Sequence, residues 1–71
     1  MIAYFYKSYC DNESQYFNLK MVEGEQTLLT LMGVHFELNF TENDIINRAN
    51  EIAQTLPDYQ LIEVVIDYAS T

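Results

Sequence analysis

The chain has 71 residues, of which 49% are hydrophobic and 14% aromatic, and its formal net charge is -8 at pH 7. This length excludes a second domain of ordinary size, and the hydrophobic content is too high for an intrinsically disordered chain. Eleven Asp and Glu residues against three Lys and Arg residues exclude a basic patch for direct binding to nucleic acid. We therefore expect a single small domain over residues 1–71.

Groups that stabilise small proteins or carry catalysis are scarce. Cys10 is the only cysteine and has no disulfide partner in the chain, and one cysteine with one histidine cannot supply the four ligands of a structural zinc site. The only glycines, Gly24 and Gly33, exclude a glycine-rich phosphate-binding loop. We expect no metal, no cofactor and no enzymatic activity, and burial against a partner remains as a source of added stability.

The pattern of apolar residues argues against membranes and secretion. No apolar run approaches the roughly 20 residues that span a bilayer, and a strongly negative chain is repelled by anionic lipids. The first residues lack the basic start and long apolar stretch of a signal peptide. We expect the protein in the cytoplasm.

The first half of the chain predicts hairpins. Residues 2–8 are rich in aromatics without Gly or Pro, which favours a strand, and residues 11–14 read Asp-Asn-Glu-Ser, which favours a turn. Residues 16–22 alternate apolar with polar side chains, so a second strand follows, and residues 23–25 make a second turn. The residues of this second strand that we expect to face the core are Phe17, Leu19 and Met21.

Residues 27–40 allow two interpretations. Val34 to Phe40 alternates apolar and polar residues, as a strand does. Residues 27–32 either continue that strand through a bulge at Gly33 or form a short helix that Gly33 ends as a C-cap. Thr27 and Thr30 are β-branched, so we favour the strand.

A helix from Thr41 to Leu56 is the clearest local prediction. Thr41 is a good N-cap, Glu42 and Asp44 place negative charge at the positive end of the helix dipole, and Pro57 ends the helix. Its apolar stripe consists of Ile45, Ile46, Ala49, Ile52, Ala53 and Leu56.

Residues 59–68 predict a last strand. Its core side consists of Ile62, Val64, Ile66 and Tyr68. Its other side consists of Tyr59, Leu61, Glu63, Val65 and Asp67, which is too apolar for a solvated face and too acidic for a core. If this strand lies at a sheet edge, it can pair with a second copy and form a homodimer.

The expected fold class is α+β: an antiparallel sheet of about four strands with one α-helix packed on one face, in the order β-β-β(-β)-α-β. A second arrangement remains open, in which the helix is a crossover that joins parallel strands.

Two polar groups are weak candidates for chemistry. His35 and Glu37 project from the same face of a strand, as an acid/base pair would, but no nucleophile accompanies them. Residues 11–13 carry oxygen ligands but lack the spacing of a calcium loop, so we interpret them as a turn.

Six tyrosines occur together with eleven carboxylates, which favours a protein-binding surface. Tyrosine offers a large contact area, and carboxylates beside it pair with Lys or Arg on a partner. At least two of the tyrosines should be buried in the core. The predicted partner-binding residues are Tyr9, Asp11, Glu13, Tyr16, Glu23, Glu25, Glu37, Glu63 and Asp67.

The small size, the single helix at residues 41–56 and the carboxylates from Asp11 to Asp67 resemble the small acidic anti-CRISPR proteins of phages. This resemblance is one of overall profile and implies an inhibitor that blocks the basic nucleic-acid-binding surface of a Cas protein or surveillance complex in the bacterial host cell. The alternative is a non-enzymatic adaptor or antitoxin-like protein that dimerises through its sheet.

Overall fold

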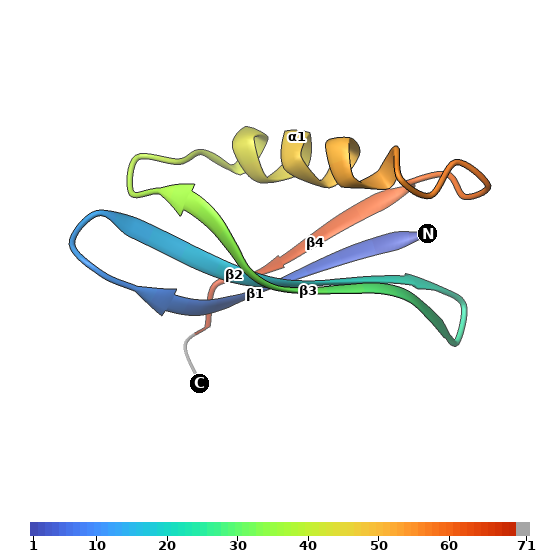
Figure 1. The fold of residues 1–71 in the computed structure, drawn as a ribbon, viewed down its shortest axis with the longest axis horizontal. Coiled ribbons are helices and arrows are strands. Elements are labelled where there is room, and N and C mark those ends of the chain that lie inside the picture. Colours follow the sequence, from blue (N-terminus) through green and yellow to red (C-terminus); the bar gives the residue numbers. More distant parts are fainter. Residues whose placement is uncertain (70–71) are drawn as a thin grey trace.

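The computed structural model describes residues 1–69, which form a four-stranded sheet with one helix across one face (Figure 1). The strands lie in the order β3-β2-β1-β4. In chain order the elements are β1 (Ile2–Cys10), β2 (Ser14–Glu23), β3 (Gln26–Glu37), α1 (Glu42–Ala53) and β4 (Glu63–Asp67). The predicted α+β class, with four strands and one helix on one face, is confirmed.

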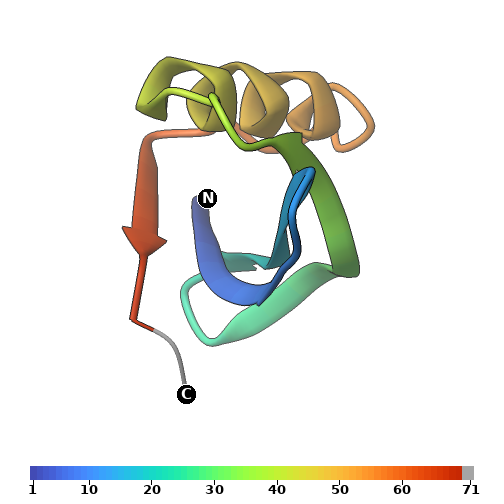
Figure 2. The same ribbon diagram turned by 90° about the vertical axis from the view of Figure 1, so that its left-hand side faces the viewer.

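The sheet is mixed, which corrects the expectation of an antiparallel one. β2 pairs antiparallel with both β1 and β3, whereas β4 pairs parallel with β1. After β3 the chain passes along α1, over one face of the sheet, and enters β4 at the opposite edge (Figure 2). Because β3 already runs in the direction of β1, a helix that carries the chain back along the sheet delivers β4 in that same direction.

Both predicted hairpin turns are present. In the turn between β1 and β2, Asp11 Oδ1 accepts hydrogen bonds from the backbone N–H of Glu13, at 2.9 Å, and of Ser14, at 2.8 Å. The turn between β2 and β3 contains Gly24 at a φ of 58°, which a residue with a side chain rarely adopts.

β3 is one continuous strand, so the strand interpretation of residues 27–32 is confirmed and the helix is not formed. Its pairing with β2 shifts register where Asn18 lies opposite both Met32 and Gly33. Gly33 has a φ of 68°, and its N–H donates to Asn18 Oδ1 at 3.1 Å. This is the bulge that the glycine predicts.

β1 contains a bulge that the alternation of its sequence does not reveal. Lys7 pairs with Phe17, but the next pair joins Tyr9 to Tyr16, so Ser8 is an extra residue. The buried Gln15 amide donates to the carbonyl of Tyr9 at 2.9 Å and to that of Tyr16 at 2.7 Å. The bulge places Tyr9 on the same face of the sheet as Tyr16.

The helix begins as predicted and ends three residues early. Thr41 Oγ1 accepts from the N–H of Asp44 at 3.3 Å, and Asp44 Oδ2 accepts from the N–H of Thr41 at 2.8 Å, which completes a capping box. The last helical residue is Ala53, not Leu56. Pro57 disfavours helical geometry at the residue before it, and the chain from Gln54 onward tightens into turns.

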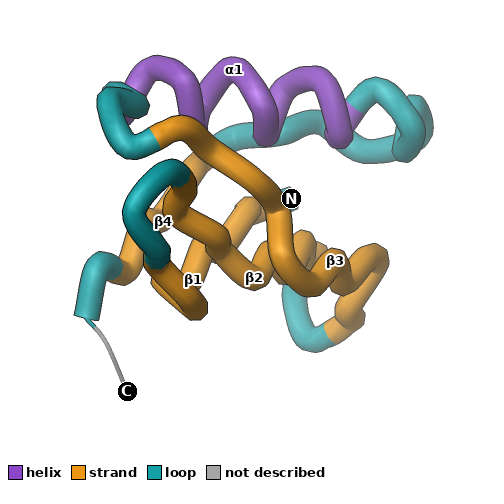
Figure 3. Tube along the Cα trace, turned by 60° about the vertical axis from the view of Figure 1, so that its left-hand side comes forward, coloured by secondary structure: helices purple, strands orange, loops and turns teal. Residues whose placement is uncertain are grey.

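α1 lies over one face of the sheet (Figure 3). The buried apolar side chains lie between the helix and that face. These core residues are Met1, Ala3, Phe5, Phe17, Leu19, Met21, Val34, Phe36, Ile45 and Ala49. The expected core positions Phe17, Leu19 and Met21 are all 0% exposed.

β4 is shorter than the expected last strand and lies at a sheet edge. Val64 and Ile66 pack on the core, as expected, whereas Ile62 precedes the strand and is 70% exposed. Within residues 1–69 no helix has the length and apolar character needed to cross a bilayer.

Candidate functional site

The sheet face opposite α1 carries a group of tyrosines. Directly paired residues share a face, and Tyr9 on β1 pairs with Tyr16 on β2, which pairs with His35 on β3. Tyr4 and Tyr6, also on β1, pair with Lys20 and Asn18 of β2 on this same face. We call the surface formed by Tyr4, Tyr6, Tyr9, Tyr16 and His35 the tyrosine face.

The rings of the tyrosine face contact one another across the strands. The ring centroids of Tyr9 and Tyr16 are 5.9 Å apart, and those of Tyr16 and His35 are 5.4 Å apart. Tyr4 and Tyr6 stack with an interplanar angle of 14° at 6.4 Å. Tyr9 remains 60% exposed and Tyr6 43% exposed, so both offer ring area to a partner.

The expectation that at least two tyrosines are buried is wrong. Tyr4, Tyr16 and Tyr59 are half-buried, and the other three tyrosines are exposed. Three of the four phenylalanines fill the space between sheet and helix instead, where Phe5, Phe17 and Phe36 contact one another edge to face. The tyrosine hydroxyls therefore keep access to water, and more aromatic surface is exposed than the sequence suggested.

The negative charge lies entirely on the surface. All eleven Asp and Glu residues are exposed. Glu23 lies 3.4 Å from the ammonium group of Met1, and Glu51 lies 4.0 Å from Nε of Arg48. Within the described residues, the other nine carboxylates have no cationic group within 4.0 Å.

The predicted partner-binding residues fall into two groups at opposite ends of the sheet. The first group lies at the end with the β1–β2 turn and consists of Tyr9, Asp11, Glu13, Tyr16 and Glu37. Glu37 belongs to it because Glu37 pairs with Ser14, the first residue of β2.

The second group lies at the end with the β2–β3 turn. Glu23 and Glu25 are there, and Glu63 lies at the same end because it pairs with Ile2, which also pairs with Val22. Asp67 pairs with Tyr6 and so lies beside the tyrosine face. Tyr4, Tyr6 and His35 belong to this face but were not among the predicted contacts; the registers of β1 with β2 and of β2 with β3 bring them together.

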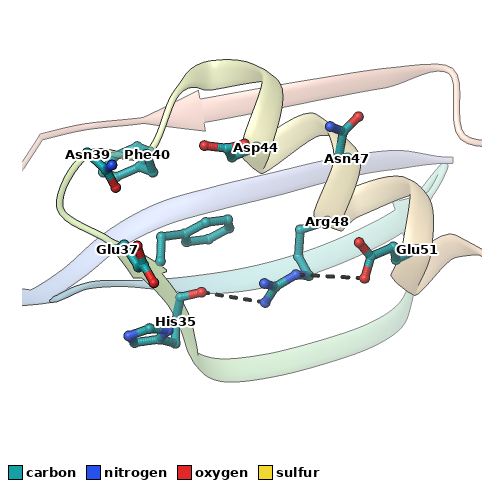
Figure 4. Close-up of a pocket in the computed structure, with 9 residues that line it drawn as sticks. His35, Glu37, Asn39, Phe40, Asp44, Asn47, Arg48 and Glu51 are labelled. Atoms are coloured by element: carbon teal, nitrogen blue, oxygen red, sulfur yellow. Dashed lines mark hydrogen bonds and ion pairs between the residues drawn. The ribbon is translucent and has the colours of Figure 1, made fainter.

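A cavity of about 390 Å³ lies between α1 and the end of β3 (Figure 4). Arg48 enters it from the helix, with its guanidinium carbon 5.2 Å from the centroid of the Phe36 ring, and its Nη1 donates to the carbonyl oxygen of His35 at 3.5 Å. The acidic residues that line the cavity are Glu37, Asp44 and Glu51. A second hollow, of about 590 Å³, shares His35 and Glu37 with the first and adds Glu13. Carboxylates therefore line both hollows, and the Arg48 guanidinium extends into the first.

Within residues 1–69 no hydrogen bond or ion pair joins His35 to Glu37. His35 Nε2 lies 2.8 Å from Ser14 Oγ, the one hydrogen bond of this ring in the described part of the chain. Cys10 is an exposed thiol whose Sγ lies 3.6 Å from the carbonyl oxygen of Asp11. In residues 1–69 no three His, Cys, Asp or Glu side chains group as metal ligands.

Comparison with known proteins gives no relative. No protein-family model, curated protein or solved structure matches the chain.

Proposed function

We propose that this protein acts by binding, without catalysis, and that it occupies a basic protein surface that otherwise binds nucleic acid. The partner in this proposal is a component of a bacterial defence complex, such as a Cas protein or surveillance complex, in the cytoplasm of the host cell. The protein then inhibits by steric block or by presenting carboxylates where phosphates would lie, as anti-CRISPR proteins of this profile do.

One observation carries the proposal: nine of eleven carboxylates are exposed without a cationic neighbour in residues 1–69. An excess of unpaired negative charge raises the rate of association with a basic partner and repels other acidic molecules. Asp67 pairs with the exposed Tyr6. Glu13 and Glu37 lie with the exposed Tyr9 at the end of the sheet that carries the β1–β2 turn, so charge and contact area occur together there.

A second candidate is an adaptor that dimerises through β4, because β4 lies at an edge of the sheet. Antiparallel pairing of two copies about Val65 would place Glu63 of each copy opposite Asp67 of the other. Like charges directly opposite destabilise a strand pair, so the acidic residues disfavour this dimer.

The test is phage plaquing on a panel of bacterial strains that each carry one active CRISPR–Cas system and express this protein. We expect restored plaquing of a targeted phage in at least one strain, with no change for an untargeted phage. The double variant Glu13→Lys/Glu37→Lys should lose this effect, whereas Glu42→Lys/Asp58→Lys, with the same change in net charge, should keep it. Equal loss in both variants would show that only total charge matters, and no rescue across the panel would reject a CRISPR partner.

A further inference from the structure

We infer that the tyrosine face is the docking surface for an arginine-rich segment of the partner protein. This inference rests on the proposed function, because it specifies which surface meets the basic partner and which cation it selects. Three observations support it: the phenol rings are exposed, carboxylates lie beside them, and within residues 1–69 no helix or strand covers this side of the sheet.

The rings are arranged to accept flat cations. Tyr9, Tyr16 and His35 form a row across three strands, and Tyr4 and Tyr6 form a stack on β1. The mutual contacts hold the rings in place, so a ligand orders few side chains when it binds. A planar guanidinium group stacks on a tyrosine ring, whereas a lysine ammonium is a compact and more strongly hydrated charge.

Carboxylates lie next to these rings on the same face of the sheet. Asp67 on β4 pairs with Tyr6, and Glu37 on β3 follows His35 by two residues on the same face. The hollow next to His35 also contains Glu13. An arginine that stacks on Tyr6 therefore has Asp67 on the neighbouring strand, and one that stacks on Tyr16 next to His35 has Glu37 on the same face. Arginine pairs with carboxylates through two parallel hydrogen bonds.

A guanidinium group between an aromatic ring and a carboxylate already occurs in the described part of the fold. Arg48 lies over the Phe36 ring at 5.2 Å, and its Nε lies 4.0 Å from a carboxylate oxygen of Glu51. The proposed ligand would repeat the pairing of ring, guanidinium and carboxylate on the opposite side of the sheet.

Two other occupants fit the charges poorly. A single-stranded nucleic acid can stack its bases on tyrosines, but within residues 1–69 Lys20 is the one cation whose pairing places it on this face, and the chain carries a net charge of -8. A second copy of the chain brings the same negative charge, so its approach is repelled.

The test is an NMR titration of the isotope-labelled protein with three probes: a deca-arginine peptide, a deca-lysine peptide and a ten-nucleotide oligothymidylate. We expect deca-arginine to bind about tenfold more tightly than deca-lysine, with ring shifts at Tyr6, Tyr9 and Tyr16. The variant Tyr6→Ala/Tyr9→Ala should lose about tenfold in affinity for deca-arginine, while Tyr6→Phe/Tyr9→Phe, which keeps the rings, should retain it.

Matched charge variants separate local from general attraction. Asp67→Asn and Asp58→Asn each remove one negative charge, but only Asp67 lies beside the tyrosine face. We expect the first variant to weaken deca-arginine binding more than the second. Equal affinities for the two peptides, shifts confined to α1 or the turns, saturable oligothymidylate binding at the tyrosines, or self-association through this face would each overturn the inference. If plaquing is still restored, those results reject the tyrosine face and leave the proposed function standing.

Discussion

Phe17 is a fully buried side chain whose ring contacts four other aromatic rings, so its truncation is a sharp test of the fold. It is 0% exposed, and its ring contacts those of Phe5, Phe36, Phe40 and Tyr68 at centroid distances of 5.7–6.2 Å. A buried Phe→Ala change costs about 3–5 kcal/mol. The total free energy of unfolding of a domain of this size is about 3–5 kcal/mol, so the Phe17→Ala variant should be largely unfolded at 25 °C.

The assay is urea unfolding followed by circular dichroism, with amide NMR dispersion as a second measure of folding. Phe17→Leu keeps an apolar side chain and should stay folded, with about 2 kcal/mol less stability. Met32→Ala is the control: Met32 is an apolar residue of the same sheet that is 74% exposed, and its loss should change stability by less than about 0.5 kcal/mol. A Phe17→Ala protein within about 1 kcal/mol of the unsubstituted one would refute this description of the core.

Three further predictions concern the helix start, the β3 bulge and the sheet edge. Thr41→Ala removes the side-chain half of the capping box and should cost about 1 kcal/mol in urea unfolding; a change below about 0.3 kcal/mol would contradict the capping role. In Gly33→Ala the new Cβ has no atom within 4 Å, but the backbone must keep a φ of 68°. The variant should therefore be about 1 kcal/mol less stable in urea unfolding. A neutral or stabilising effect would show that this φ is not strained for alanine. The unsubstituted protein should sediment as a monomer at neutral pH, because like charges on β4 oppose pairing of two copies at this edge. The variant Glu63→Gln/Asp67→Asn removes these charges and should shift the protein toward a dimer. A dimer of the unsubstituted protein would contradict the role of these charges.

Local sequence patterns predicted most of the elements. The alternation of Phe17, Leu19 and Met21 identified the core side of β2, and the capping residues at Thr41 and Asp44 identified the start of α1. These signals are local, because the side-chain period and the helix cap each depend on a few neighbouring residues.

The parallel pairing of β4 with β1 was not predictable in the same way. A half-buried strand shows similar alternation whichever way its neighbour runs, and the direction of β4 depends on where the crossover through α1 delivers the chain. The early end of α1 at Ala53 likewise depends on turns that Pro57 imposes upstream.

The composition predicted that tyrosines and carboxylates form the candidate site, but which of them share a face depends on the strand register. The sequence pointed to Tyr9 and Tyr16 with nearby carboxylates, but simple alternation along β1 would place Tyr9 on the core side with Phe5. The extra residue Ser8 reverses this, so that Tyr9 joins Tyr6 and Tyr16 on the uncovered face. A one-residue bulge of this kind leaves no clear mark in a single sequence.

We propose that this protein competes with nucleic acid for a basic surface. The most direct test of this claim is fluorescence anisotropy of labelled target DNA bound to the CRISPR complex whose interference the protein blocks, titrated with the protein at 50 mM and at about 300 mM salt. We predict displacement of the DNA, with an affinity of the protein for the complex that falls as salt rises. Continued binding of DNA beside the protein, or an affinity that does not depend on salt, would contradict the claim.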